Sequence, residues 1–515
     1  MDWFDDWALT LAVFVPLVGM ALVLTIPKAQ ETAIKATALM TAVLTGVVGV
    51  GILTQFDYHH SGKLQFQANE PWIDVIKSRF HVGIDGIALP LLILSMLVVI
   101  LCIIYSWNHF PKPHNPKAFL ALILLLEVGM NGTFVAQDLI LFFIFFELVL
   151  LPMFFMIGVW GGPNREYASI KFFLFTLFGS ALMLVGFLAL FFVSKQQTFD
   201  MVTLSKFAGS GISTGTQSLI FGGLFLGFAI KVPMFPFHTW LPDAHTEAPT
   251  VGSVLLAAIM LKLGTYGFIR IALPILPEAA KDWAPWIGLL AVIGIIYGSL
   301  ACLAQRDMKR LIAFSSVAHM GFVMLGIATL TDFGMNAAVF GMVAHGLITG
   351  MLFFVAGSVQ ERYETREMSR LGGLLTQAPK LGWILGFSAM ASLGLPGLAG
   401  FWGEFPAILS SYSPAKTAAG LLGSGNLWTF RTFMVIAAIG TVLAAGYLLW
   451  MLQRVAFGKV KAEFEGAHIH DVHVSEWIAW APMLALIVAL GIYPDLLFSI
   501  TDGAVGNVAK VFGTS

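Results

Sequence analysis

The segment Ala229–His238 reads AIKVPMFPFH and lies inside an apolar run at about 217–240. Its two prolines, Pro233 and Pro236, remove backbone donors and interrupt an α-helix. Lys231 lies beside that interruption, at a depth where a spanning helix is surrounded by hydrocarbon. The run therefore predicts a broken membrane helix that carries a charge.

A second apolar run, at about 380–411, has the same character. Its centre, Gly394–Phe405, reads GLPGLAGFWGEF and combines glycines and a proline with Glu404. Cations are favoured at the end of a helix and anions at its start, so we expect Lys231 to end one half-helix and Glu404 to lie near the start of another. Interrupted helices in two halves of a chain indicate a transport site, although a packing kink is the alternative for each break.

The chain is too poor in charge to cover a globular surface of its size. Of its 515 residues, 58% are hydrophobic and 11% are charged, whereas soluble domains carry about 25% charged residues. One spanning helix needs about 20 apolar residues, which leaves room for many spans and little else. The composition predicts a single membrane domain over residues 1–515.

The sequence contains no motif typical of a nucleotide, nucleic-acid or metal site. The formal net charge is −1 and no basic tract is present, so nucleic-acid binding is not expected. No GxGxxG or P-loop pattern opens a strand–helix unit. Cys102 and Cys302 lie in apolar runs without a CxxC partner, so we expect no metal or iron–sulfur site on this chain.

Spanning runs follow one another along the chain and predict an all-α polytopic membrane protein of about fourteen helices. The longest polar connection, about 54–83, is compatible with a β-hairpin. The acidic segment Met1–Trp7 lacks the positive region of a signal peptide, so we interpret the first run as a retained helix. The runs lie at about 7–27, 32–53, 84–107, 117–136, 138–158, 168–193, 217–240, 250–271, 284–303, 309–330, 334–357, 380–411, 427–457 and 476–499.

Lysine and arginine are more frequent in the odd-numbered loops than in the even-numbered ones. Loops that are rich in these residues face the cytoplasm. The distribution therefore predicts that both termini face away from the cytoplasm.

Several ionisable residues lie inside the apolar runs, where a charge costs about 2.5–3.5 kcal/mol on insertion scales. One such residue is often a polar contact between helices, but a set spread over several helices favours a path for protons. The members of this set are Glu127, Glu147, Lys231, Lys262, His319, His345 and Glu404.

Lys262 lies near the middle of its run, where burial favours the neutral amine. A lysine in this position can release and rebind a proton, and a movable acid nearby would control that exchange. Glu147 is equally deep, and we propose that it pairs with Lys231.

His319 and His345 lie on adjacent runs between Lys262 and Glu404 in chain order. An unperturbed histidine titrates near neutral pH and suits a proton relay, although a lone membrane histidine is more often a hydrogen-bonding core residue. His238 and His245 flank the first break and are weaker candidates for an entrance.

Five stretches of the chain resemble the antiporter-like family shared by complex I (NADH–quinone oxidoreductase), Mrp-type cation/proton antiporters and membrane-bound hydrogenases. The longest and most specific matching stretch is Phe237–Thr250, which reads FHTWLPDAHTEAPT. The match covers about residues 80–460. The other matching stretches are Phe80–Ile87, Lys231–Pro233, Ser315–Gly321 and Gly394–Phe405.

The resemblance implies two inverted five-helix repeats, at about 117–271 and 284–457, with helices 7 and 12 broken. It assigns Glu147 and Lys231 as a coupling pair, Lys262 as the central proton carrier and Glu404 as the distal site. His319 and His345 are the implied relay groups. Glu127, His238 and His245 remain secondary candidates.

The distal residue separates branches of the family, because the L- and N-type complex I subunits and Mrp subunits carry lysine where this chain has Glu404. The resemblance therefore implies a third complex I branch, with the L- and N-type subunits as partners. NADH, FMN, iron–sulfur clusters and quinone are expected on other subunits. The chain stops soon after its last run, so the long lateral helix of the L type is expected to be absent.

The mechanism that we expect starts with quinone chemistry elsewhere in the complex. A changed field separates Glu147 from Lys231, and Lys262 then passes its proton through the histidines and bound water to Glu404. The alternatives are a subunit of a sodium/proton antiporter or of a membrane-bound hydrogenase, and a structural spacer in the membrane.

Overall fold

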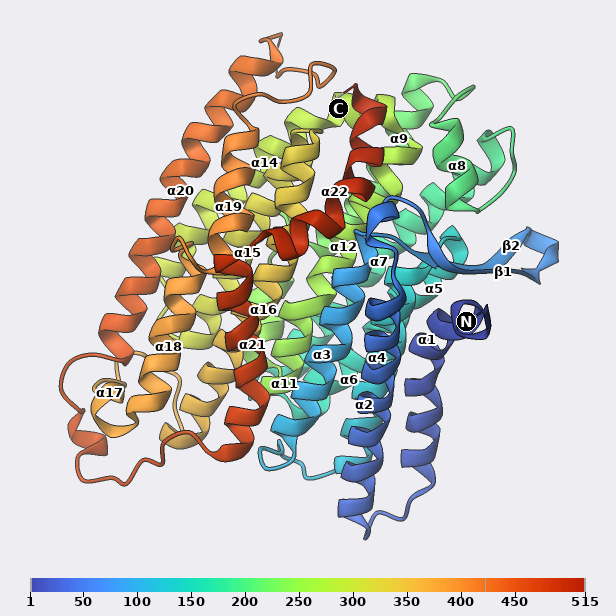
Figure 1. The fold of residues 1–515 in the computed structure, drawn as a ribbon. Coiled ribbons are helices and arrows are strands. Elements are labelled where there is room, and N and C mark those ends of the chain that lie inside the picture. Colours follow the sequence, from blue (N-terminus) through green and yellow to red (C-terminus); the bar gives the residue numbers. More distant parts are fainter. Residues whose placement is uncertain (1, 422, 514–515) are drawn as a thin grey trace.

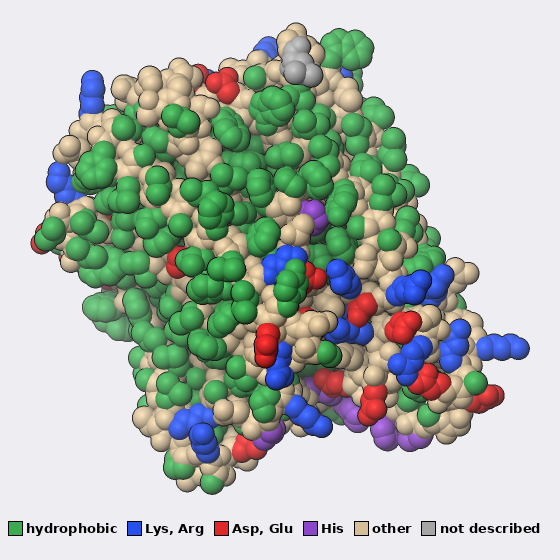
Figure 2. Space-filling model, turned by 180° about the vertical axis from the view of Figure 1, so that it is seen from behind, with side chains coloured by type: hydrophobic (Ala, Val, Ile, Leu, Met, Phe, Trp, Pro, Cys, Tyr) green, Lys and Arg blue, Asp and Glu red, His purple; other side chains and the backbone are tan. Residues whose placement is uncertain are grey.

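The computed structural model describes residues 2–421 and 423–513, which form a helical bundle with one two-stranded sheet at its edge (Figure 1). Twelve helices in the described residues are long and apolar enough to cross a membrane. Hydrophobic side chains cover most of the face in Figure 2, and charged groups gather toward one end. These features confirm the predicted all-α membrane fold.

The first half of the chain contains the sheet and the first broken helix. Its elements are α1 (Asp2–Thr25), α2 (Glu31–Gln55), β1 (Gln65–Ile73), β2 (Ser78–Ile84), α3 (Ala88–Ser106), α4 (Pro116–Val135), α5 (Leu139–Leu148), α6 (Leu150–Trp160), α7 (Arg165–Val193), α8 (Met201–Phe207), α9 (Thr214–Lys231), α10 (Trp240–Glu247), α11 (Thr250–Leu255), α12 (Leu261–Gly267) and α13 (Leu273–Ile275).

The second half is helical apart from its loops. Its elements are α14 (Pro277–Leu303), α15 (Met308–Ala328), α16 (Asp332–Tyr363), α17 (Leu374–Gln377), α18 (Pro379–Ser392), α19 (Ala399–Ser410), α20 (Asn426–Val455), α21 (Val474–Ile492) and α22 (Asp495–Ala509).

Helices α15 and α16 form the centre of the bundle. α16 packs against α15, α18, α19, α21 and α22, and the spanning parts of α15 and α16 are wholly buried. Outer helices such as α7 and α20 expose large apolar side chains, including Phe178 and Val442, as a lipid-facing surface requires. Polar residues on α15 and α16 are therefore shielded from lipid.

The first predicted break separates α9 from α10. α9 ends at Lys231, and α10 begins at Trp240. Pro233 and Pro236 occupy the gap, where neither can donate to a helical carbonyl. The break and the position of Lys231 at the end of a half-helix are as predicted.

The second predicted break separates α18 from α19. α18 ends at Ser392 and α19 begins at Ala399. In the gap, Gly394 and Gly397 have φ values of +78° and +93°, a region that favours glycine because a Cβ would be strained. The two five-helix repeats at 117–271 and 284–457 stay a prediction.

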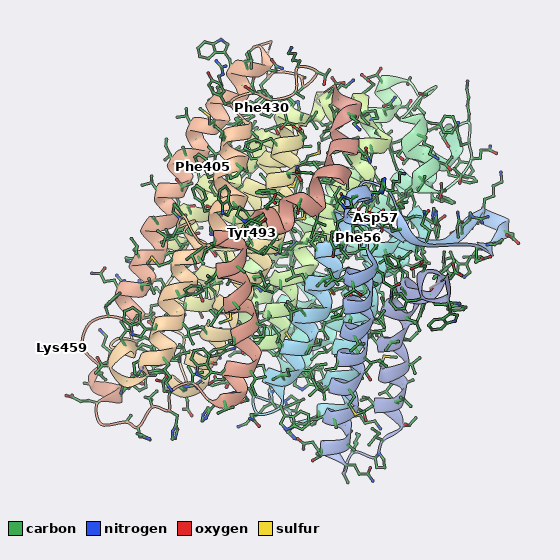
Figure 3. All side chains as sticks on the ribbon, in the orientation of Figure 1. Phe56, Asp57, Phe405, Phe430, Lys459 and Tyr493 are labelled. Carbon is green, nitrogen blue, oxygen red and sulfur yellow. The ribbon has the colours of Figure 1, made fainter. Side chains whose placement is uncertain are left out.

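Other interruptions were not foreseen. The run predicted at 138–158 is divided between α5 and α6, because the ring of Pro152 crowds the carbonyl of Leu148, the last residue of α5. The run predicted at 476–499 is wrong as one helix, since Pro494 ends α21 and starts the separate helix α22. Tyr493 marks that turn in Figure 3.

The long connection after α2 forms an antiparallel hairpin of β1 and β2, in which Asn69 pairs with His81. Its second strand is tied to the bundle: His81 Nδ1 lies 2.6 Å from Asp200 Oδ2, and Ser78 donates to Asp138 at 2.9 Å. These contacts fix the hairpin at the edge of the bundle (Figure 1).

Both ends of the chain lie at the hairpin end. Phe4 in α1 contacts Phe66 in β1 with ring centroids 6.3 Å apart. Near the other terminus, the Asn507 amide donates to the Gly62 carbonyl at 2.8 Å. Figure 3 also shows that Phe430 and Lys459 lie near opposite ends of α20.

We expect Asp200→Asn to destabilise the hairpin anchor by about 1.5–3 kcal/mol near neutral pH, the usual range for hydrogen bonds to a charged group. Burial alone would raise the pKa of Asp200, but hydrogen bonds from His81 and Thr203 outweigh burial and lower it. This contribution is fully present above the unfolded pKa of about 3.9. It is lost as the pH falls through the lower folded pKa.

Thermal unfolding of the wild type and Asp200→Asn in detergent, measured across pH, checks this expectation. The difference in unfolding temperature should be constant near neutrality and should shrink below about pH 4. A difference that keeps its size in acid would show that the carboxylate charge is not responsible.

Candidate functional site

Lys231 is buried at the end of α9, with 2% of its surface exposed. Its Nζ lies 4.7 Å from the centre of the Phe146 ring and, within the described residues, has no hydrogen-bond partner. The half-helix C-terminus and the ring face both favour a cation there. The Lys231 amine is thus buried without a fixed acceptor.

Glu147 lies in the last turn of α5, just before the bend at Pro152. Its charge and that of Lys231 act on each other, and Ser180 also interacts with the carboxylate. However, none of the ion pairs within 4.0 Å in the described part of the chain joins Glu147 to Lys231. The predicted pair therefore has no direct ion contact in this structure: Lys231 Nζ lies over the Phe146 ring, and Glu147 Oε1 has no hydrogen-bond partner among the described residues.

Lys262 is fully buried in α12, and its Nζ makes two short contacts. It donates to the Ala257 carbonyl at 2.5 Å and lies 2.7 Å from His345 Nδ1. Ala257 belongs to a π-helical turn, Leu256–Met260, that directly precedes α12. Such turns alter the helical ladder and are frequent at functional sites, and here one carbonyl faces the lysine.

His319 on α15 is bonded to the predicted distal residue. Its Nδ1 lies 2.6 Å from Glu404 Oε1, while its Nε2 lies 3.0 Å from the Tyr447 hydroxyl and 3.2 Å from Ser392 Oγ. Both ring nitrogens therefore have partners capable of exchanging a proton.

The helix-start explanation for Glu404 is wrong. Glu404 is the sixth residue of α19, beyond the first turn in which the positive helix end favours an anion. Its contact with His319, and not the end of its own half-helix, holds the carboxylate in place.

A small cavity of about 20 Å³ links the two histidines, and it is also lined by Glu404, Ser392 and Thr349. The rings of His319 and His345 have centroids 6.2 Å apart. His345 Nε2 has no hydrogen-bond partner among the described side chains. A site needs about 10–15 Å³ and polar partners to hold one water, so a single water fits between His345 and the His319–Glu404 pair.

The secondary candidates lie around this path without a described hydrogen bond to it. His245 stacks on Phe353 with ring centroids 4.5 Å apart, and His238 stacks on Phe235 at 5.7 Å. Glu127 in α4 is fully buried, and neither carboxylate oxygen has a partner in the described residues.

Three groups near the path were missed from the sequence. Tyr447 and Ser392 contact His319, but a hydroxyl in an apolar run carries no signal of its partner. Lys309 adjoins Arg306 and Arg310 in the sequence and was not among the candidate residues, yet it is 2% exposed and donates to the Ala248 carbonyl.

Lys309 lines a cavity of about 460 Å³ at the end of the bundle away from the hairpin. Glu247 and Arg366 also line it, and Arg366 binds Glu247 with 3.6 Å between the charged atoms. Ala248 and Pro249, the residues between α10 and α11, also line the cavity, so it lies beside the segment that leads to the Lys262 helix.

No group of three or more His, Cys, Asp or Glu within residues 2–421 and 423–513 is placed to hold a metal ion. Cys102 and Cys302 are buried free cysteines. The polar groups in contact at the centre of the bundle are the Lys262 amine, the His345 and His319 imidazoles and the Glu404 carboxylate. Groups of these types are suited to proton exchange.

Known proteins resemble the chain over almost its whole length. Residues 136–427 match the family model described as NADH:quinone oxidoreductase/Mrp antiporter, and residues 11–133 match NADH-ubiquinone oxidoreductase chain 4, amino terminus. NADH-quinone oxidoreductase subunit M of Rickettsia prowazekii is 38% identical over 507 residues, covering 98% of this chain and 99% of the relative.

Solved structures show the same fold. A chain of respiratory complex I from Thermus thermophilus has a TM-score of 0.86 and 28% identity, covering 98% of this chain and 100% of that chain. A chain of the Mrp complex from Dietzia sp. has a TM-score of 0.83 at 19% identity, covering 99% and 98%, and supports the fold alone.

We expect Trp240→Phe to lower the unfolding temperature of the protein, because it weakens the segment between α9 and α10. The Trp240 indole donates to the Ile230 carbonyl at 2.9 Å, and this carbonyl lies where α9 loses its helical partners. Leaving a buried carbonyl unsatisfied costs about 1–3 kcal/mol. Thermal unfolding in detergent checks the loss, with Trp286→Phe at a half-exposed position as the control. Equal unfolding temperatures for the two variants would contradict the role of Trp240.

Proposed function

Because this chain belongs to the NADH:quinone oxidoreductase/Mrp antiporter family of membrane proteins, we propose that it is the M-type, proton-translocating subunit of an NADH–quinone oxidoreductase. The identity to M subunits extends over nearly the full length of both chains. Glu404 at the distal position agrees with this branch, where the L, N and Mrp branches were expected to carry lysine.

One observation carries the proposed activity: an almost continuous series of proton-exchanging groups crosses the buried centre. Lys262 lies 2.7 Å from His345, and His319 lies 2.6 Å from Glu404. These distances are within the range in which a proton transfers directly. The cavity between the two pairs has the volume for one water, which would complete the series.

The ring of His345 suits a relay because its two nitrogens face different partners. A proton arriving at Nδ1 from Lys262 leaves from Nε2 toward the cavity. Water then carries it to the His319–Glu404 pair. Lys262 is the carrier in this scheme, the histidines are relays, and Glu404 is the distal acceptor.

The open arrangement of Glu147 and Lys231 supports a switch. We propose that closing this pair favours a proton on Lys262 and that opening it, as in this structure, favours transfer to His345. Moving one charge against the membrane potential costs about 2.3 kcal/mol per 100 mV. A change of a few pKa units, at about 1.36 kcal/mol each, is of the required size.

The redox cofactors of the complex are proposed to lie on other subunits. An Fe–S cluster requires four cysteine or histidine ligands, and the two cysteines here are single residues on separate helices. Other membrane subunits of the complex are the partners, and we propose the L- and N-type subunits as the immediate ones. We propose a bacterial inner membrane as the location, since M-subunit relatives include those of Rickettsia prowazekii and Rhodobacter capsulatus. The loop charges favour both termini in the periplasm.

We expect Lys262→Ala to abolish NADH-driven proton pumping by the assembled complex and to slow its quinone reduction, because the two are coupled. Loss of a proton-transfer group typically costs about 10²–10⁴-fold in its own step. Pumping is measured with a pH-sensitive dye in membrane vesicles, and assembly by native electrophoresis. Lys459→Ala, at an exposed loop position, is the control. Intact pumping in assembled Lys262→Ala would refute the carrier role and favour a spacer.

We expect Glu404→Gln to impair pumping in the same assay while preserving assembly, because glutamine can still contact His319 but cannot carry the proton. Glu465→Gln, in an exposed loop, provides a matched control. Normal pumping by Glu404→Gln would show that this carboxylate has only a structural role. Sodium-dependent transport by the isolated chain would instead support an independent antiporter.

A further inference from the structure

A second buried charged cluster lies on the Lys262 helix, toward the hairpin end. Arg270 Nη2 binds Asp85 Oδ1 at 2.5 Å, and Arg270 Nε donates to the Tyr266 hydroxyl at 3.2 Å. Tyr266 is fully buried, and the Arg270 and Asp85 side chains are 13% and 6% exposed. The proton path described above uses none of these three groups, which we call the clamp.

The clamp follows Lys262 along one side of its helix. Lys262, Tyr266 and Arg270 are spaced four residues apart, so they lie on successive turns, roughly 6 Å apart along the axis. A second π-helical turn, Phe268–Ala272, contains Arg270. One π-helical turn therefore precedes Lys262 and contains its carbonyl partner Ala257, and the other follows it and contains Arg270.

A cavity of about 250 Å³ opens beside the clamp at the hairpin end. Asp85 and Arg270 line it together with Lys206 and Asn507, whereas Tyr266 and Lys262 do not. The volume accommodates several waters, at about 30 Å³ each. Water can therefore approach to Arg270, about two helical turns from Lys262, and is stopped there.

The hydrogen bonds of the clamp oppose proton transfer. Tyr266 donates to the Phe134 carbonyl at 2.8 Å and accepts from Arg270, so its hydroxyl proton is held by a carbonyl that cannot pass it on. Asp85 Oδ1 also accepts from the backbone amides of Ile87 and Ala88. A guanidinium never gives up its proton in proteins, and a fixed cation repels an approaching proton.

We propose that Arg270, positioned by Asp85 and Tyr266, is an electrostatic barrier that prevents protons in the hairpin-end cavity from reaching Lys262. This inference rests on the proposed function, since it assigns Lys262 as the proton carrier. Without such a barrier, protons would flow back through the relay and dissipate the gradient that the complex generates.

The test uses the purified whole complex in proteoliposomes, without NADH. An acid pulse is applied outside, and a pH-sensitive dye inside reports passive proton entry. Arg270→Gln removes the charge but retains a donor for Asp85, and it should raise passive proton entry several-fold. Arg270→Lys retains the charge, so its passive proton entry should equal that of the wild type. Lys206→Ala lines the same cavity outside the clamp and should also stay tight.

The double variant Lys262→Ala/Arg270→Gln decides whether the leak passes through the carrier. Loss of the leak in the double variant supports the proposal, and persistence of the leak overturns it. An assembled Arg270→Gln complex without a leak also overturns it. If Arg270→Gln does not assemble, Asp85→Asn/Arg270→Gln, which leaves no unpaired buried charge, is measured in the same way and judged by the same outcomes.

Pumping by Lys262→Ala separates this inference from the proposed function. A tight Arg270→Gln complex combined with lost pumping in Lys262→Ala would refute the barrier alone. Normal NADH-driven pumping in Lys262→Ala would refute the carrier role on which the barrier depends.

Discussion

A membrane interior supplies no water to a buried charge or an unpaired carbonyl, so the chain must provide every partner itself. Lys262 shows the consequence. Its ammonium is removed from solvent, and its two contacts, Ala257 and His345, come from a distorted turn of its own helix and from the central helix α16. The lysine can exchange its proton only with a group that the fold places beside it. The packing of the helices therefore decides which group receives the proton of Lys262.

The same constraint governs the two broken helices. Each break frees backbone groups, and in each half a tryptophan stabilises the region: Trp240 donates to Ile230 at 2.9 Å, and Trp402 donates to Gly491 at 2.8 Å. The first break leaves Lys231 at the end of α9, and α19, which follows the second break, carries Glu404 to the end of the polar series beside His319. Because the surrounding helices are tightly packed, a change at Glu147 and Lys231 is more readily transmitted as a switch between discrete contacts than as a gradual deformation.

Local patterns were enough to predict both breaks, since proline and glycine act over a few residues. The alternation in the long polar connection was only compatible with the hairpin that the structure contains. Contacts between residues far apart in the sequence were predicted less accurately. Glu147 and Lys231 were expected to form a direct pair and do not, although their charges interact. Lys309, at the start of an apolar run, was not among the candidates and is buried against Ala248. Glu404 depends on His319 for its position, because it lies beyond the first turn of α19.

The amino-acid sequence by itself determined that this is a helical membrane protein with charged, interrupted spans, because hydrophobic run length and helix-breaking residues are local properties. It also identified the ionisable residues, since any such residue in an apolar run is costly and needs a reason. Only the tertiary structure decided their order of contact, the one-water cavity between the histidines, and the clamp of Asp85 with Arg270, which are 185 positions apart. Contacts of that kind depend on how helices pack across the bundle, and no local pattern encodes them.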